Sequence, residues 1–227
     1  MRCKITIFFR IYQIYRIFFV ILHDFLKLWS RIMQKIESVA VYCASSNQLK
    51  EVYYKEARRL GNRLAEAGIR VLYGDGGIGL MGALADGVLE KGGEIVGVIP
   101  QFMVDEHWNN PRSSRTIVTQ TMHERKATME KMADGMIALP GGIGTTEELF
   151  ECLTWKQLGL HTKPVVLLNI DGFFDRVLAL IDQMVEGNFL RDIHRNMFVV
   201  VNSADEAIEA LRNAPEWDAS IRREAAI

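Results

Sequence analysis

The sequence predicts an α/β fold in which helices cover both faces of a mostly parallel central sheet. Seven short apolar runs alternate along the chain with segments of helical spacing. The runs are apolar at nearly every position, which is typical of strands buried on both sides, since a half-solvated sheet would alternate polar and apolar residues. With 227 residues and 49% hydrophobic content, the chain can build one sizeable domain.

Each expected strand is a short run rich in Val, Ile, Leu and other apolar residues. The second begins just after Gly68, and proline stops the third at Pro100 and the fifth at Pro140, because proline lacks the N–H that a sheet ladder needs. In chain order, the expected strands are residues 37–43, 69–73, 94–99, 116–119, 136–139, 164–169 and 197–201.

Between the strands, apolar side chains recur at helical spacing, as Leu60 and Leu64 do in the first such segment. Glycine ends the first two helices, and Ser203 is expected to begin the last one in a capping box with Glu206. Residues 101–115 lack clear periodicity and are expected to form a long loop, a kind of segment that is often functional. In chain order, the expected helices are residues 51–67, 80–90, 122–133, a helix from residue 145, residues 173–186 and a helix after residue 203.

The N-terminal segment differs from the rest of the chain. Residues 1–32 are strongly apolar and carry a net charge of +5, against −6 for the remainder. The longest apolar run, residues 17–22, is far shorter than the ~20 residues that span a bilayer, and a small-residue cleavage site is missing. The segment is either an amphipathic helix on a membrane surface or an extension upstream of a true start at Met33, and we favour the extension. The expected organisation is an extension at 1–32, one domain at 33–214 and a tail at 215–227.

Composition and cysteine spacing argue against several classes of protein. The body of the chain is mildly acidic, whereas a nucleic-acid-binding domain normally presents a basic face, so we expect no nucleic-acid partner. Cys3, Cys43 and Cys152 form neither a CxxC pair nor a Cys/His cluster with zinc spacing, which indicates reduced thiols in a cytoplasmic protein. The HExxH metal motif and the P-loop GxxxxGK(S/T) are both missing, so we expect no metal and no P-loop ATP hydrolysis.

The stretch from residue 135 to residue 148 reads as a buried strand, a bare glycine loop and a helix. Three of the four residues after Pro140 are glycines, which leaves backbone N–H groups open to a ligand. A loop of this kind ahead of a helix attracts anions, through its unpaired N–H groups and the helix dipole. Glu147 and Glu148 are expected in the first helical turn, where they would repel a phosphate and so face another part of the ligand, such as a sugar. Alternatively, both are simply favourable first-turn residues.

Several loops are expected to meet at one edge of the sheet. Residues 74–79 fit the GxGxxG dinucleotide fingerprint, but that fingerprint belongs to a first βα turn and this loop follows the second strand. NAD binding by a dehydrogenase is therefore a weak alternative, and a tight turn without a ligand is another. Ligands of parallel sheets bind beyond the carboxyl ends of the strands. The polar turn at Ser45, residues 74–79, the loop after Pro140 and the start of the helix at residue 122 should share this edge.

The helix at residues 122–133 begins with His123, Glu124, Arg125 and Lys126. Basic residues in a first turn oppose the helix dipole, so they are either merely solvated or lie near a negative ligand such as a substrate phosphate. Arg125 and Glu148 begin successive helices after successive strands, so both should point into one cleft. An arginine and carboxylates beside a phosphate cradle fit N-glycosidic bond cleavage, because a carboxylate can stabilise its oxocarbenium-like transition state.

Three motifs resemble those of the Lonely Guy (LOG) family. Residues 140–148, PGGIGTTEE, are similar to its PGGxGTxxE signature, and residues 122–126, MHERK, to its MHxRK element. Residues 74–82 are similar to its GGGxxGLMG loop, with Asp75 in place of a glycine, and the resemblance extends over residues 36–211. It implies a Rossmann-like, typically dimeric phosphoribohydrolase that releases the base from nucleoside 5′-monophosphates such as cytokinin ribotides. It also implies no cofactor, and the older lysine decarboxylase label of such proteins does not fit, since a pyridoxal-phosphate lysine motif is missing.

The resemblance implies that Arg125 and Glu148 are the catalytic pair, with Glu148 stabilising the ribosyl cation and positioning water. The glycine loop and Arg125 would hold the 5′-phosphate. Adding the turns named above, the expected substrate contacts are Ser45, Gly76, Gly77, Lys126, Gly141, Gly142, Ile143, Gly144, Thr145, Thr146, Glu147 and Thr154. The alternative function is a nucleotide sensor or carrier that uses the same edge without chemistry. The preferred base depends on the pocket near residues 101–115 and stays open.

Overall fold

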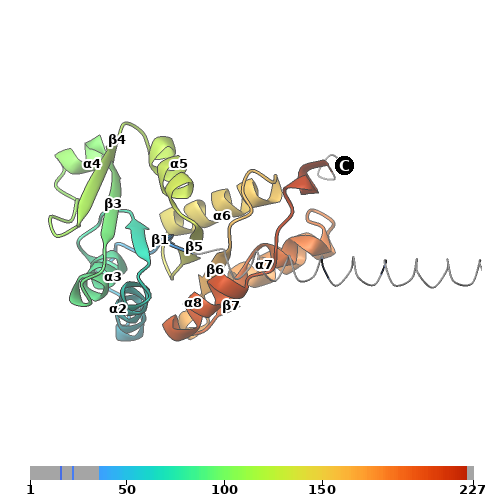
Figure 1. Cartoon of the computed structure of the whole chain (residues 1–227), viewed down its shortest axis with the longest axis horizontal. Helices are drawn as coiled ribbons and strands as arrows, with labels where there is room; N and C mark the ends of the chain where they lie inside the picture. The colour runs from blue at the N-terminus through green and yellow to red at the C-terminus, as the bar shows by residue number, and fades with distance from the viewer. Residues whose placement is uncertain (1–15, 17–21, 23–35, 224–227) are drawn as a thin grey trace, which may run out of the picture. The chain divides into compact units, whose positions relative to one another are not determined.

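A seven-stranded parallel sheet forms the centre of the fold in the computed structural model, which describes residues 16, 22 and 36–223 (Figure 1). The strand order is β4-β3-β2-β1-β5-β6-β7, and every neighbouring pair is parallel. The predicted α/β class with a parallel sheet is therefore confirmed. The strands are β1 (Ser38–Tyr42), β2 (Arg70–Tyr73), β3 (Ile95–Pro100), β4 (Arg115–Thr119), β5 (Gly135–Ala138), β6 (Val165–Leu168) and β7 (Val199–Val201).

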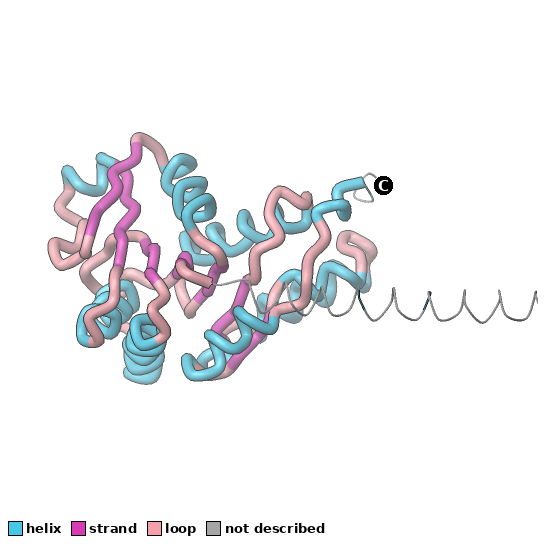
Figure 2. Tube along the Cα trace, viewed as in Figure 1, coloured by secondary structure: helices cyan, strands magenta, loops and turns pink. Residues whose placement is uncertain are grey.

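Helices cover both faces of this sheet, as Figure 2 shows. One face is covered by α2 (Glu51–Glu66), α3 (Gly79–Glu90) and α8 (Ala204–Asn213), whose buried side chains share one core. The opposite face is covered by α5 (Met122–Met132), α6 (Ile143–Gln157) and α7 (Asp175–Glu186). The three layers follow from the strand pattern, since side chains of successive strand residues point to opposite faces.

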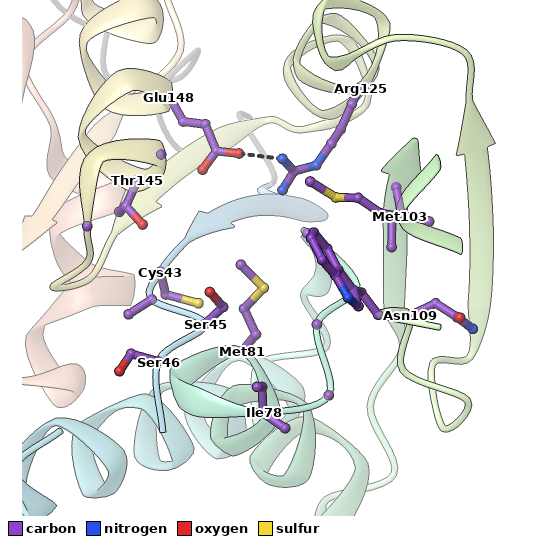
Figure 3. Close-up of a pocket in the computed structure, with 18 of the residues that line it drawn as sticks. Cys43, Ser45, Ser46, Ile78, Met81, Met103, Asn109, Arg125, Thr145 and Glu148 are labelled. Atoms are coloured by element: carbon purple, nitrogen blue, oxygen red, sulfur yellow. Dashed lines mark ion pairs between the residues drawn. The ribbon is translucent and has the colours of Figure 1, made fainter. Parts of the chain in front are cut away.

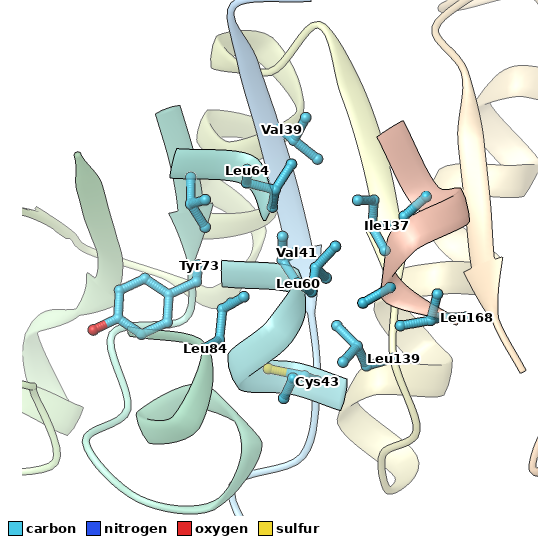
Figure 4. Packing of buried hydrophobic residues seen from close by; sticks show 14 of the residues in the cluster. Val39, Val41, Cys43, Leu60, Leu64, Tyr73, Leu84, Ile137, Leu139 and Leu168 are labelled. Carbon is cyan, nitrogen blue, oxygen red and sulfur yellow. The ribbon is translucent and has the colours of Figure 1, made fainter. Parts of the chain in front are cut away.

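The alternation is clearest in β1. Val39 and Val41 pack with Leu60 and Leu64 of α2 in the first core (Figure 4). Ala40 and Tyr42, whose side chains point to the other face of the sheet, belong to the second core. Both sets are essentially inaccessible to solvent, so the strand is buried on two sides. This explains why the strand sequences are continuously apolar.

The chain reverses its winding direction at β1. It proceeds from β1 outward through β2 and β3 to β4, and then returns to place β5 on the other side of β1. Connections that leave β1 and β5 therefore diverge above their carboxyl ends. Such a switch point leaves a crevice in an open parallel sheet, and ligands bind there.

Three details of the sequence interpretation are wrong. The expected loop at residues 101–115 begins with a short helix, α4 (Gln101–Asp105). Helix α6 begins at Ile143, before Thr145, so Glu147 and Glu148 lie in its second turn. Ser203 does not complete a capping box, because its Oγ donates to Oε1 of Glu206 (2.6 Å) and accepts no backbone N–H.

Beyond α8 the chain returns to the second core. Trp217 and Ile221 are buried there, and Nε1 of Trp217 donates to the carbonyl oxygen of Lys156 on α6 (2.6 Å). The expected extension at 1–32 lies almost wholly outside the described residues. Among the helices that the structure describes, none combines the length and the apolarity needed to cross a membrane.

Replacing Gly79 with alanine should destabilise the fold. Gly79 has a φ of +64°, and a Cβ there would lie 2.5 Å from the backbone of Ser45. We expect the free energy of unfolding to fall by about 2–4 kcal/mol in denaturant titrations. Gly144→Ala is the control, since its Cβ would meet no atom within 4 Å inside a helix. Equal stability of the two variants would contradict the crowding argument.

Candidate functional site

A pocket of about 820 Å³ lies at the carboxyl ends of the strands, where the winding reverses (Figure 3). Ser45 follows β1, Gly76 follows β2 and Met103 follows β3, and each lines it. Arg125 enters from α5 after β4, and residues 142–145, 147 and 148 enter from the start of α6 after β5. Segments from five βα connections thus meet in one cavity, as the sequence predicts.

The pocket brings together most of the residues expected to contact a substrate. The expected residues that line it are Ser45, Gly76, Gly77, Arg125, Gly142, Ile143, Gly144, Thr145, Glu147 and Glu148. Four others do not line it: Lys126, Gly141, Thr146 and Thr154. The hydroxyls of Thr146 and Thr154 donate to carbonyl oxygens of the preceding helical turn, at 3.0 and 2.7 Å. These two hydroxyls therefore bind the backbone at α6 and do not point to a ligand in the pocket.

Arg125 and Glu148 form an ion pair inside the pocket. Nη1 of Arg125 lies 3.1 Å from Oε1 of Glu148, and the two side chains are only 7% and 6% exposed (Figure 3). Nε of Arg125 donates to the carbonyl oxygen of Val98 on β3 (3.0 Å), which fixes the guanidinium plane. Gly74 makes room for it, since a Cβ there would lie 2.3 Å from Nη2. The guanidinium is thereby held between Glu148 on α6 and Val98 on β3.

The electrostatics of the pair follow from its burial. Burial raises the pKa of Glu148 above the ordinary glutamate value, while the neighbouring charge of Arg125 opposes this rise. Burial also raises the pKa of the Cys43 thiol, which lines the same pocket, so this thiol stays protonated at neutral pH. A carboxylate with little water around it and a fixed orientation can stabilise a positive charge that develops on a ligand.

Lys126 points to the other side of α5. Its Nζ forms ion pairs with Glu147 and, at 3.1 Å, with Glu151, so it joins α5 to α6. The side chain is 7% exposed and borders a small separate cavity beside Glu130 and Trp155. Neighbouring residues of one helix therefore differ in role: Arg125 enters the pocket, whereas Lys126 fixes the helix that carries Glu148.

The N-terminus of α6 forms an open site for an anion. Gly142 precedes the helix in extended conformation without a side-chain cap. The first helical bond runs from the N–H of Thr146 to the Gly142 carbonyl oxygen (3.1 Å), so the N–H groups of Ile143, Gly144 and Thr145 have no intrahelical acceptor. A Cβ at Gly144 would meet no atom within 4 Å, so a ligand can approach this backbone. Free N–H groups and the helix dipole together favour a phosphate.

The N-terminus of α3, which carries the GxGxxG stretch, is closed. The N–H groups of Leu80 and Met81 both donate to the carbonyl oxygen of Ala44, at 2.9 and 3.3 Å. Gly79 is needed because Ser45 crosses directly against it. This arrangement ties the loop after β1 to α3 and leaves little donor capacity for a pyrophosphate, which argues against the dinucleotide interpretation.

One wall of the pocket could not be predicted residue by residue. It is mainly apolar and comes from α3, β3, α4 and the segment after α4. Periodicity gave no signal here, although the functional importance expected of residues 101–115 indicated the right region. The wall residues missed from the sequence are Ile78, Met81, Ile99, Met103, His107, Trp108 and Asn109.

Comparison with known proteins places this geometry in context. A family model described as "Possible lysine decarboxylase" matches residues 81–211. The chain is 40% identical to the cytokinin riboside 5′-monophosphate phosphoribohydrolase LOG2 of Arabidopsis thaliana, over 81% of this chain and 87% of that protein. It is likewise 40% identical to the phosphoribohydrolase LOG of Oryza sativa subsp. japonica, over 82% of this chain and 78% of that protein.

Solved structures share the fold. The molybdenum cofactor carrier protein of Chlamydomonas reinhardtii superimposes with a TM-score of 0.59 at 22% identity, over 79% of this chain and 98% of the other. The molybdenum cofactor binding protein of Rippkaea orientalis gives 0.57 at 23% identity, over 77% and 94%. At these identities the likeness concerns the architecture alone.

The anion site at α6 can be tested by removing one N–H group. Ile143 is the first helical residue, a position that accepts proline, so Ile143→Pro should remove a donor and leave the helix intact. We expect it to weaken the binding of inorganic phosphate by roughly tenfold, on the scale of one charge-assisted hydrogen bond, in an NMR titration. Ile143→Ala keeps the N–H and should bind as the wild type does. Unchanged phosphate binding by the proline variant would place the anion elsewhere.

Proposed function

This chain belongs to the LOG family of cytokinin riboside 5′-monophosphate phosphoribohydrolases, and from that membership we propose that it hydrolyses the N-glycosidic bond of a nucleoside 5′-monophosphate. The substrate is AMP or a cytokinin riboside monophosphate. Water adds to C1′ as the bond to the base breaks, the bonding electrons leave with the base, and a proton from water neutralises it. The products are the free base and ribose 5-phosphate.

The observation that carries this proposal is the joint position of the buried ion pair and the open helix N-terminus. Arg125, Glu148 and the first residues of α6 line one cavity. Glu148 follows Ile143 by five residues, hence by about 7.5 Å along the helix. This separation is comparable with the length of a ribose 5-phosphate. A phosphate on the N–H groups of residues 143–145 would therefore bring C1′ near the carboxylate.

Glu148 is the residue to which we assign stabilisation of the transition state. As the base departs, positive charge builds on C1′ and the ring oxygen, and an ionised carboxylate nearby stabilises it while orienting the attacking water. Arg125 holds this carboxylate in place, and its charge opposes the rise that burial causes in the pKa of Glu148. Because its Nε is bound to Val98, the arginine cannot follow the ligand freely, so the site is organised before substrate binds.

The apolar wall is the part of the pocket suited to the base. Trp108, which is 57% exposed, offers a flat aromatic ring, and Met103 offers a polarizable thioether. A purine presents a flat face that such side chains can cover. The same wall would accept an apolar substituent on the base, which fits the substrates in the names of the plant relatives.

A carrier that binds the nucleotide without cleaving it is the rival function. Two structural neighbours, one named a molybdenum cofactor carrier and the other a molybdenum cofactor binding protein, share the architecture of this chain. Incubation of the purified protein with AMP distinguishes the two functions, with chromatography to detect adenine. Release of adenine supports hydrolysis, whereas AMP that is bound and recovered intact supports a carrier.

We extend the proposal to assembly and location. A homodimer is the state that the family resemblance implies, and the exposed side chains of Ile78, Trp108 and Ile143 at the pocket give a second copy apolar surface to cover. Light scattering coupled to gel filtration would measure the mass. A cytoplasmic location fits Cys43 and Cys152, which are free buried thiols.

Replacement of Glu148 with glutamine should abolish most of the turnover. The amide keeps the shape of the side chain but cannot stabilise the ribosyl cation, so we expect kcat for base release from AMP to fall roughly 10²–10³-fold. AMP affinity should change little, because the phosphate site lies at the helix start. Glu90→Gln is the control, since that carboxylate pairs with Arg58 and does not line the pocket. A Glu148→Gln enzyme that works at the wild-type rate would overturn the mechanism.

The pH dependence should report the ion pair. Glu148 must be ionised to act, so kcat/KM falls as the pH drops through its pKa, which burial already raises. Arg125→Met removes a charge that lowers this pKa, so the acidic limb of the residual activity should move to higher pH. Arg112→Met is the control, because Arg112 pairs with Asp86 away from Glu148. An acidic limb that stays in place would show that the two charges are not coupled.

A further inference from the structure

Asp75 is a buried carboxylate inside the glycine-rich loop after β2. Its side chain is inaccessible to solvent, and its φ of +62° is a left-handed conformation that glycine adopts more readily. Gly74 and Gly76 on either side line the pocket, but Asp75 does not. The mechanism proposed above makes no use of this carboxylate. A charged side chain in this position therefore calls for a separate role.

The carboxylate is held by a network of hydroxyl groups. Thr116 Oγ1 donates to Oδ2 (2.9 Å) and Ser113 Oγ donates to Oδ1. Ser113 Oγ also forms a hydrogen bond with the hydroxyl of Tyr73 (2.7 Å). The Tyr73 hydroxyl in turn accepts a hydrogen bond from Nδ2 of Asn110 (3.0 Å). Burial raises the pKa of Asp75, and the bonds from Ser113 and Thr116 oppose that rise. The partner of Oδ1 thus lies on the segment just before β4, and the partner of Oδ2 lies on β4 itself.

The fold provides a fitted space for this side chain. A Cβ at Gly97 on β3 would lie 1.9 Å from Oδ1 of Asp75, so any other residue at position 97 would displace the carboxylate. The backbone joins the same two segments. The N–H of Asn110 donates to the carbonyl oxygen of Asp75 (2.6 Å), and Gly76 forms an isolated antiparallel bridge with Asn109.

These contacts end at one part of the pocket, which we call the 107–110 wall. Its residues His107, Trp108 and Asn109 line the cavity, and Asn110 is buried behind them. Figure 3 shows Asn109 on the side of the pocket away from Thr145. His107 has a φ of +59°, a strained conformation that persists only where surrounding contacts maintain it. Asp75 contacts this wall directly through its carbonyl oxygen, which accepts from the N–H of Asn110, and its carboxylate reaches Asn110 through Ser113 and the Tyr73 hydroxyl.

We propose that Asp75 is a positioning residue that fixes the 107–110 wall against the glycine loop and so sets which bases the pocket accepts. This inference rests on the proposed function, since it assigns the wall to the base. Arg125 and Glu148 are held by Val98 and by each other, without Asp75. Loss of the carboxylate should therefore change substrate affinity and base selectivity more than the rate of bond cleavage.

Asp75→Gly tests this directly, because glycine keeps the left-handed backbone without strain while it removes the carboxylate. We expect KM for AMP to rise roughly tenfold, with kcat within about threefold of wild type. The ratio of kcat/KM between AMP and IMP should change by roughly fivefold or more. Asp75→Asn fits the space and tolerates the backbone, so it should give intermediate values. Thr116→Val removes one hydrogen bond to Oδ2 of Asp75 and serves as the test variant if Asp75→Gly does not fold.

Asp134→Asn is the matched control. The carboxylate of Asp134 accepts hydrogen bonds from the N–H groups of Glu37 and Ser38 and from Oγ of Ser38. These residues lie at the amino ends of β1 and β5, whereas the pocket lies at the carboxyl ends of the strands. Asp134→Asn should lower the melting temperature and leave KM and the AMP/IMP ratio unchanged. If Asp75→Gly likewise lowers only the melting temperature, Asp75 is purely structural and the proposal is overturned.

The two hypotheses fail in different ways. A wild-type enzyme that releases no base contradicts the proposed function. The wall is then tested by dissociation constants for AMP and IMP: a shifted ratio in Asp75→Gly supports the positioning role, and an unshifted ratio overturns it. A wild-type enzyme that releases base, combined with an Asp75→Gly variant of wild-type KM and selectivity, contradicts the positioning role alone.

Discussion

The buried ion pair of Arg125 and Glu148 is the interaction on which the site depends. Removing two charges from water is unfavourable, and their mutual attraction offsets this only when geometry and further hydrogen bonds are good. Here Nε of Arg125 is satisfied by the Val98 carbonyl oxygen, and Gly74 leaves the guanidinium room. A hydrophobic pair would serve stability as well. The pair makes better sense as a carboxylate held ionised and oriented inside a cavity.

The topology of the sheet brings the parts of the site together. Because the winding reverses at β1, connections that leave β1 and β5 diverge and open a crevice beside α6. The two glycine-rich loops at this crevice then differ in use. The N–H groups that begin α3 bind the Ala44 carbonyl oxygen, whereas the residues that begin α6 line the cavity and their N–H groups have no intrahelical acceptor. Two similar glycine-rich sequences therefore have different roles. The one before α3 binds the loop after β1, and the one before α6 forms a site for an anion.

The sequence predicts the strands, the main helices and the meeting of the loops, because these follow from apolar periodicity and from the rule for parallel sheets. It does not predict the details that depend on tertiary contacts. Gly144 lies inside the first turn of α6, so the helix begins earlier than glycine content suggests. Lys126 faces Glu151 and not the pocket because adjacent helix residues diverge by about 100°. The partners of Asp75 lie on β4 and the segment before it, beyond the reach of any local pattern.

A crystal structure of the protein with ribose 5-phosphate would test the central claim most directly. The account predicts that the phosphate contacts the N–H groups of residues 143–145 and that C1′ lies beside the Glu148 carboxylate, with Arg125 still bound to it. A phosphate bound at the start of α3, or a sugar that points away from Glu148, would contradict the assignment of these residues to N-glycosidic bond cleavage.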